Sequence, residues 1–144
     1  MRYLILFILP ALVGFSCSGN SSEAESSESI DSTYCDCFEL TFDQQYNHWW
    51  RYERRKGFTG NCDVKQANGN VDYEKNFIDG KMEGEYIVYH ENGQPYKIRN
   101  YMQNFQDGDS YTYSKSGRLI AHAIYKRGHL KEMVFEDRSI NIED

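Results

Sequence analysis

Three cysteines, Cys35, Cys37 and Cys62, carry the most specific chemistry in the body of this 144-residue chain. In an oxidising compartment such residues form disulfides, and an odd number leaves one thiol unpaired. We predict a bridge from Cys35 or Cys37 to Cys62. A Cys-X-Cys metal site with His48 is the alternative, but no second pair of ligands stands at a spacing that suits zinc. We therefore predict no metal and no cofactor.

The fourth cysteine, Cys17, indicates the compartment. It directly follows an apolar stretch at residues 3–15, which is too short to span a bilayer but suits the core of a signal peptide. A cysteine in this place is typical of a bacterial lipoprotein cleavage site, so we predict a signal peptide at residues 1–16 and a lipid on Cys17. Ordinary secretion and an uncleaved anchor are the alternatives.

The residues that follow Cys17 predict a tether. Residues 17–33 are mostly Ser, Glu, Gly and Asn, a composition that cannot bury enough apolar surface to fold. We therefore expect a lipid-anchored protein of the bacterial cell envelope, held to the membrane through its N-terminus. The net charge of −6 argues against nucleic acid as a partner, because nucleic-acid binding depends on neutralising phosphates.

The four histidines, His48, His90, His122 and His129, give little support for catalysis. They fall in unrelated parts of the chain, and His122 occupies a position that is Ile98 one repeat earlier. No Ser-His-Asp order, glycine-rich phosphate loop or paired-carboxylate motif stands out. We expect no enzyme and name no catalytic residue.

Aromatic side chains are the candidates for binding. Trp49 and Trp50 adjoin a basic cluster at residues 51–56, which is a candidate surface for anionic lipids or an acidic partner. We favour a solvated strand edge for this cluster, because charged side chains there discourage aggregation of sheets. Tyr89 and Tyr113 would form an open row that binds a protein, a glycan or a lipid, but we favour their burial because repeat proteins need a continuous core.

A repeat of 24 residues determines which elements position these side chains. A fixed period of this kind means that one small structural unit is used repeatedly. The residues that recur one period apart are Gly60, Gly84 and Gly108; Gly69, Gly93 and Gly117; Tyr89 and Tyr113; and Phe77, Tyr101 and Tyr125.

Each copy of the repeat is predicted to be a β-hairpin. Residues 84–89 and 94–101 are rich in β-branched and aromatic side chains, and Asn92-Gly93 between them tolerates the positive φ angles of a tight turn. A second turn, Asp79-Gly80, leads into the next copy. The corresponding strands are predicted at residues 62–64 and 71–77 in the first copy and at residues 110–113 and 119–125 in the third.

The ends of the array are less regular. Residues 34–59 are predicted to form a degenerate cap hairpin, with strands at 37–42 and 46–53, and residues 133–135 close the sheet before a polar tail at 138–144. We therefore predict an all-β antiparallel meander of about eight or nine strands, with its regular repeats at residues 60–137. Since Lys65 replaces the tyrosine of the other copies, we expect the first copy to pack less well.

The cap raises a geometric difficulty. If Cys37 lies in a regular hairpin, it is two strands from Cys62, or roughly 9–10 Å. A disulfide needs Cα atoms within about 7 Å. Either residues 34–37 fold back over the sheet, or the cap is not a copy of the repeat.

The repeat resembles the MORN type (membrane occupation and recognition nexus) in its bacterial variant. The resemblance rests on Gly84, Tyr86, Tyr89, the Asn92-Gly93 turn and Tyr101, and it covers roughly residues 56–135. It implies the hairpin architecture and says little about function. We expect a membrane-anchored, non-enzymatic binding or scaffold protein whose partner is an envelope protein or glycan. The alternative, implied by the label that bacterial members often carry, is an antitoxin or immunity-type protein that neutralises a toxin.

Overall fold

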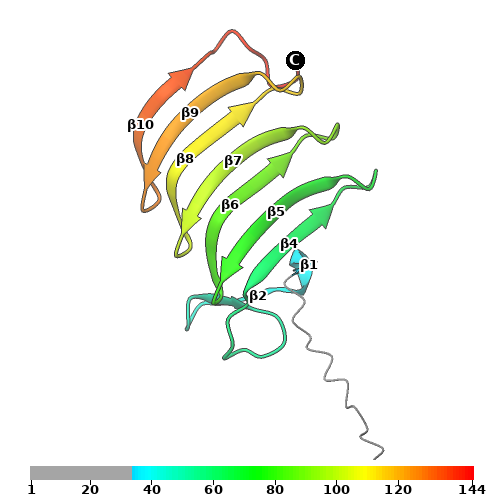
Figure 1. Ribbon diagram of the computed structural model, residues 1–144, viewed down its shortest axis with the longest axis vertical. Helices are drawn as coiled ribbons and strands as arrows, with labels where there is room; N and C mark the ends of the chain where they lie inside the picture. Colours follow the sequence, from blue (N-terminus) through cyan, green and yellow to red (C-terminus); the bar gives the residue numbers. More distant parts are fainter. Residues whose placement is uncertain (1–33) are drawn as a thin grey trace, which may run out of the picture.

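The computed structural model describes residues 34–144 and confirms an all-β fold (Figure 1). The predictions for residues 1–33, which include the signal peptide, Cys17 and the tether, lie outside the described residues. The elements are β1 (Tyr34–Asp36), the 3₁₀ helix η1 (Cys37–Glu39), β2 (Thr41–Asp43), β3 (His48–Trp50), β4 (Gly60–Lys65), β5 (Val71–Ile78), β6 (Lys81–Tyr89), β7 (Pro95–Met102), β8 (Phe105–Tyr113), β9 (Leu119–Lys126) and β10 (His129–Glu136).

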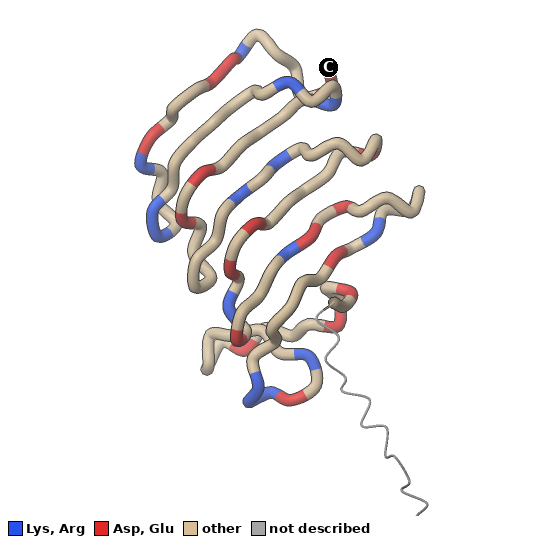
Figure 2. Tube along the Cα trace, viewed as in Figure 1, with Lys and Arg blue, Asp and Glu red and all other residues tan. Residues whose placement is uncertain are grey.

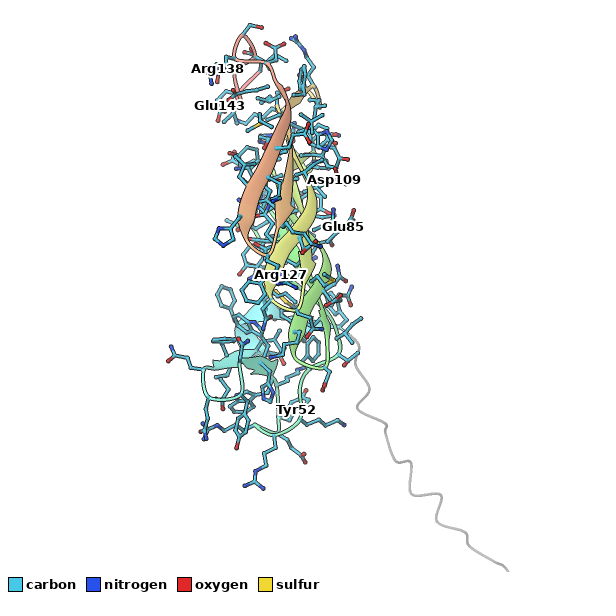
Figure 3. The ribbon with its side chains drawn as sticks, turned by 90° about the vertical axis from the view of Figure 1, so that its left-hand side faces the viewer. Tyr52, Glu85, Asp109, Arg127, Arg138 and Glu143 are labelled. Atoms are coloured by element: carbon cyan, nitrogen blue, oxygen red, sulfur yellow. A yellow bond between two sulfur atoms is a disulfide. The ribbon has the colours of Figure 1, made fainter. Side chains whose placement is uncertain are left out.

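The main sheet is a single layer of eight strands in the order β1-β4-β5-β6-β7-β8-β9-β10. From β4 to β10 each strand pairs antiparallel with the next one along the chain, as a meander requires. The view along the sheet edge shows one layer of backbone with side chains on both sides (Figure 3). The predicted meander is therefore confirmed.

The turns that join one copy to the next lie at one end of the strands. Asp79 and Gly80 both have positive φ, of 47° and 73°, and so do Gln103 and Asn104, of 53° and 70°. Two successive positive φ angles are typical of a two-residue hairpin turn, and Asn tolerates this region better than most residues. Asn104 therefore replaces the turn glycine without changing the turn.

These turns share a side-chain contact that the sequence analysis did not find. The acceptor is always a residue that lies 20 positions before the turn, on the neighbouring strand or directly before it. The bonds are Asp79 N–H to Thr59 Oγ1 at 2.9 Å, Gln103 N–H to Glu83 Oε2 at 2.9 Å, and Arg127 N–H to Asp107 Oδ2 at 3.2 Å.

The turns within each copy differ in one respect from the prediction, which gave Asn92-Gly93 the positive φ angles of a tight turn. Gly93 has φ of 83°, as predicted, but Asn92 is not among the residues with positive φ. His90 closes the loop instead: its N–H donates to Gln94 O, and its carbonyl accepts from Gly93 N–H. The Asn92 side chain donates 2.8 Å to Lys115 O in the next copy, so it links neighbouring hairpins.

Gly84 and Gly108 lie inside strands, although we had predicted Gly84 at the beginning of a strand and Gly108 before one. Their φ angles are 84° and 106°, and the pairing register shifts beside them. Asn76 Nδ2 donates to Glu85 O at 2.9 Å and Asn100 Nδ2 donates to Asp109 O at 3.1 Å, which closes the gap that each irregularity leaves. These irregularities accompany the visible curvature of the strands (Figure 1).

The cap departs from the predicted degenerate copy. β2 and β3 do form a hairpin, but they make a separate two-stranded sheet, and the expected strand at 37–42 begins as η1 instead. β1 joins the main sheet beside β4 as a parallel strand, with Cys35 opposite Cys62. This arrangement removes the geometric difficulty, because the cysteine-bearing segment lies next to β4 rather than two strands away.

The buried core lies between the cap and the first copy. It consists of Cys35, Leu40, Phe58, Cys62 and Phe77, with Trp49 and Met82 packed against it. The expectation that the first copy packs less well is therefore wrong. Its core depends on Phe77 and the covering cap, and not on the tyrosine that Lys65 replaces.

Candidate functional site

The main sheet has two faces, and they differ in charge and polarity. Residues directly opposite each other on paired strands share a face. In one cross-strand row, Lys75 pairs with Tyr86, and Tyr86 pairs with Arg99. In the next row along the strands, Glu74 pairs with Ile87, and that row projects from the opposite side. Both rows continue across the meander.

We name the faces by their side chains. The basic face comprises Lys75, Lys97 and Arg99 with the rings of Tyr73, Tyr86 and Tyr101. The apolar face comprises Ile87, Ile98, Tyr111, His122 and Phe135 in one row, together with Tyr89 and Tyr113. Glu85 and Asp109 flank the apolar row, and Figure 3 shows them projecting from the side opposite the cap.

The predicted tyrosine row lies on the apolar face. Tyr89 and Tyr113 are two residues from Ile87 and Tyr111 on their strands, so they share that face two strands apart. Both are half-buried rather than buried in a core, and no described element covers them. Tyr89 Oη donates to Glu74 Oε1 at 2.8 Å, and burial together with this hydrogen bond raises the pKa of Tyr89 to about 12.

The middle of the apolar row holds a contact that the sequence analysis missed. The His122 ring stacks on Tyr111 with centroids 4.5 Å apart, and His122 Nε2 lies 2.6 Å from Asp109 Oδ1. A weak signal for this contact is present in the sequence, because the repeat position that is Ile98 in one copy is His122 in the copy that carries Asp109. The stack widens the flat part of the row.

Tyr89 also lines a polar pocket at the loop end of the sheet. The pocket has a volume of about 590 Å³ and is lined in addition by His90 and Lys115. Its polar groups are largely engaged: His90 Nε2 lies 3.0 Å from Tyr113 O, and Lys115 pairs with Glu143. The C-terminal tail thus folds back, since Ile142 O also accepts from Lys115 N–H.

The two tryptophans have different surroundings. Trp49 packs between Phe42 and Phe77, with ring centroids at 5.2 and 5.9 Å, so it closes the core. Trp50 lines a pocket of about 430 Å³ in the cap, where Arg54 pairs with Asp43. Both rings are half-buried, and Trp50 is the one that lines a surface pocket.

The basic cluster at residues 51–56 forms a loop at the far end of the molecule (Figure 2). Arg51 pairs with Glu39 and Arg54 pairs with Asp43, while the Tyr52 ring is 64% exposed. We had favoured a strand edge for this cluster, and that prediction is wrong because residues 51–56 form a loop outside the strands.

Cys37 and Cys62 form a disulfide with Cα atoms 4.9 Å apart. Cys35 is the remaining thiol; it is buried, and burial raises its pKa. In the Cys-X-Cys pair, Cys37 is therefore bonded in a disulfide and Cys35 is a free thiol. His48 Nε2 lies 2.7 Å from Arg54 O, so it takes no part in this cluster.

Residues 34–144 contain no cluster of three or more acidic, histidine or cysteine side chains suited to a metal. In the same residues no helix has the length and apolar character needed to cross a membrane. No protein-family model matches the chain, and comparisons with curated proteins and with solved structures give no match.

Proposed function

We propose that this protein is a lipid-anchored, non-enzymatic binding or scaffold protein of the bacterial cell envelope, which holds a protein partner on the apolar face. The observation that carries the proposal is the uncovered row that includes Ile98 and Tyr111. A contiguous apolar surface on a monomer marks an interaction site, because leaving it in water is unfavourable. No element of residues 34–144 covers this row.

The shape of the surface supports a protein partner. Each side chain of the row is only half-buried or exposed, and the row crosses five consecutive strands, from β6 to β10. Apolar and aromatic side chains with an acidic rim, here Glu85 and Asp109, have the anatomy of a protein interface. The half-buried rings would need little reorganisation on binding.

The position of the cap supports the proposed anchor. The described chain begins at Tyr34 in the cap, and Glu39 shortly after it pairs with Arg51 in the loop that carries Tyr52 and the basic cluster. Aromatic and basic side chains are favoured at membrane surfaces. A lipid on Cys17 would therefore place the cap near the bilayer and β10 away from it.

Site-specific photo-crosslinking tests the binding proposal. A benzophenone side chain at position 111 should give a discrete protein adduct in envelope extracts, identified by mass spectrometry. The matched control is position 112, the next residue on β8, which projects from the opposite face. Adducts from both positions, or from neither, would contradict a protein site on the apolar face.

Lipidation has a separate test. Cys17→Ser should abolish incorporation of radiolabelled palmitate and release the protein from the membrane fraction. Unchanged membrane association would contradict the anchor and leave the binding result standing. If the adduct from position 111 proves to be a toxic protein that the chain neutralises, the antitoxin alternative replaces the scaffold role.

A further inference from the structure

We propose that the basic face binds an acidic glycan, a chain of sugar rings that carry carboxylates. This inference goes beyond the proposed protein site, because it assigns a second class of ligand to the other side of the sheet. It follows from the charges on that face, from the arrangement of its rings, and from the pairing of the backbone groups beneath them with neighbouring strands.

The first argument is that three neighbouring cations lack an opposite charge. Lys75, Lys97 and Arg99 have no carboxylate partner within residues 34–144, whereas Lys126 pairs with Asp107 at 2.9 Å. The acidic side chains of the neighbouring row project from the opposite face, so the backbone separates them from these cations. A chain of net charge −6 thus leaves a positive patch at the centre of its sheet.

The second argument is that these cations frame aromatic rings. Lys75 Nζ lies 5.2 Å from the centroid of Tyr86, and Arg99 Cζ lies 5.6 Å from the same centroid. Tyr73 meets the Tyr86 ring edge-on at 5.9 Å, and Tyr101 lies 6.1 Å away on the other side. The three rings form a platform of mutually tilted rings on β5, β6 and β7, with Lys75 and Arg99 lying over the middle ring.

This platform suits a charged sugar. The C–H groups of a sugar ring carry slight positive charge, which the negative face of an aromatic ring attracts. A carboxylate on the same sugar pairs with a flanking cation in a charge-assisted hydrogen bond. Burial lowers the pKa of Lys75, and a bound carboxylate would favour its charged form again.

The third argument separates a glycan from an extended peptide. Strands β5 to β8 are each paired on both sides, so their backbone N–H and C=O groups are already engaged in the sheet. A peptide that binds as an added strand needs such groups at a free edge. A sugar needs only side chains, and Ser110 and Thr112 add hydroxyls on β8 beside Arg99 and Lys97.

Calorimetric titration of the purified full chain tests the proposal. The probes are hexagalacturonate, the neutral maltohexaose with the same number of rings, and a hexaglutamate peptide. We expect hexagalacturonate to bind at least about tenfold more tightly than either control probe, a factor within reach of one charge-assisted contact. Raising the salt concentration should weaken it, because the attraction is partly exposed to solvent.

Variants locate the site. Lys75→Gln/Arg99→Gln should raise the dissociation constant for hexagalacturonate at least about tenfold. Lys131→Gln is the matched control, since Lys131 is an exposed cation on β10 with no ion pair within residues 34–144, and it should leave binding unchanged. Lys97→Gln alone should weaken binding by a smaller factor, and it serves if the double variant fails to fold.

Three results would overturn the proposal: no binding of hexagalacturonate by the wild type, equal binding by the double variant, or tighter binding of hexaglutamate. None of these depends on Cys17 or on position 111. Failure of the glycan site would therefore be distinguishable from failure of the proposed anchored protein-binding role.

Discussion

The first hairpin, β4–β5, and the last three strands, β8–β10, follow the same 24-residue pattern but differ in what lies against them. Phe77 on β5 is 2% exposed beneath the cap, whereas its counterpart Tyr125 is half-buried and Phe135 on the edge strand is 42% exposed. The repeat thus defines the strands and turns without creating a core. The cap supplies the second layer that makes one end of the sheet a folded interior.

The other end of the sheet, at the edge strand β10, has no covering layer within residues 34–144 and limits pairing with other sheets in a different way. Every residue of β10 is exposed, and its pairing with β9 is interrupted twice, so that Lys131 and Val134 have no partner in the register. Irregularities and charges on an edge strand discourage pairing with another sheet. We infer that stability is concentrated near the cap, and the following predictions test that gradient.

The largest effect is expected from truncating the covered ring. Phe77→Ala should lower the free energy of unfolding by about 3–5 kcal/mol, as for other core aromatics. Phe135→Ala, at an exposed position, should lower it by less than about 1 kcal/mol. Urea denaturation of both variants measures the difference, and equal losses would mean that no gradient exists.

The disulfide should contribute next. It closes a loop over a sequence separation of 25 residues, for which the chain-entropy relation gives about 3.5 kcal/mol. The comparison is Cys35→Ala/Cys37→Ala against Cys35→Ala alone, because removing Cys35 prevents it from replacing Cys37. The difference should disappear in reducing buffer; a difference that persists there would reflect packing instead.

Two equivalent turn glycines give a matched pair across the gradient. Gly80 and Gly128 have φ of 73° and 80°, so alanine at either should cost about 1–2 kcal/mol in backbone strain. At Gly80 the new Cβ would also lie 2.7 Å from His48 Cβ and 2.8 Å from Trp49 O, whereas at Gly128 it would lie 3.9 Å from Phe105 Cδ1, an ordinary van der Waals contact. We expect Gly80→Ala to lose about 1–3 kcal/mol more than Gly128→Ala. Equal melting temperatures of the two variants would show that the cap moves to accommodate the new Cβ at little cost.

The smallest effect concerns Tyr89 of the apolar face at high pH. Because the folded-state pKa of Tyr89 is raised to about 12, its contribution to stability is present below pH 10 and is lost as pH rises toward 12. Tyr89→Phe should flatten the fall in stability between pH 10 and 12, by less than about 2 kcal/mol because the ring is only half-buried. A fall in stability as steep in Tyr89→Phe as in the wild type would argue against the Glu74 contact.

Much of the meander could be predicted because its signals are local. Glycine at 93 and 117 is required by positive φ within its own turn, and the alternation of aromatic and polar residues sets each strand. The same reasoning placed Tyr89 and Tyr113 on one face. It did not determine whether anything covers that face, because a half-buried single layer and a buried core use similar residues.

The cap could not be predicted because its contacts are non-local. Cys37 bonds Cys62 only because β1 lies parallel to β4, a pairing that no hairpin turn specifies. The basic face was missed for a related reason: Lys75 and Arg99 are 24 residues apart and become neighbours of Tyr86 only through the register of three strands. A search for residue pairs one period apart with like charge would have found them.

The hydrogen bonds between loops have a consequence for how such a molecule can change in length. Asn68 reaches Glu91 O and Asn92 reaches Lys115 O, so each hairpin is fastened to the next by the same contact. Duplicating residues 84–107 would therefore insert a hairpin whose contacts with the hairpins on both sides are contacts that the protein already makes. Each insertion would move the last strand about 10 Å further from the cap, two strand spacings at a time. The sheet can therefore lengthen in fixed steps by duplication, and no new kind of contact between hairpins is needed.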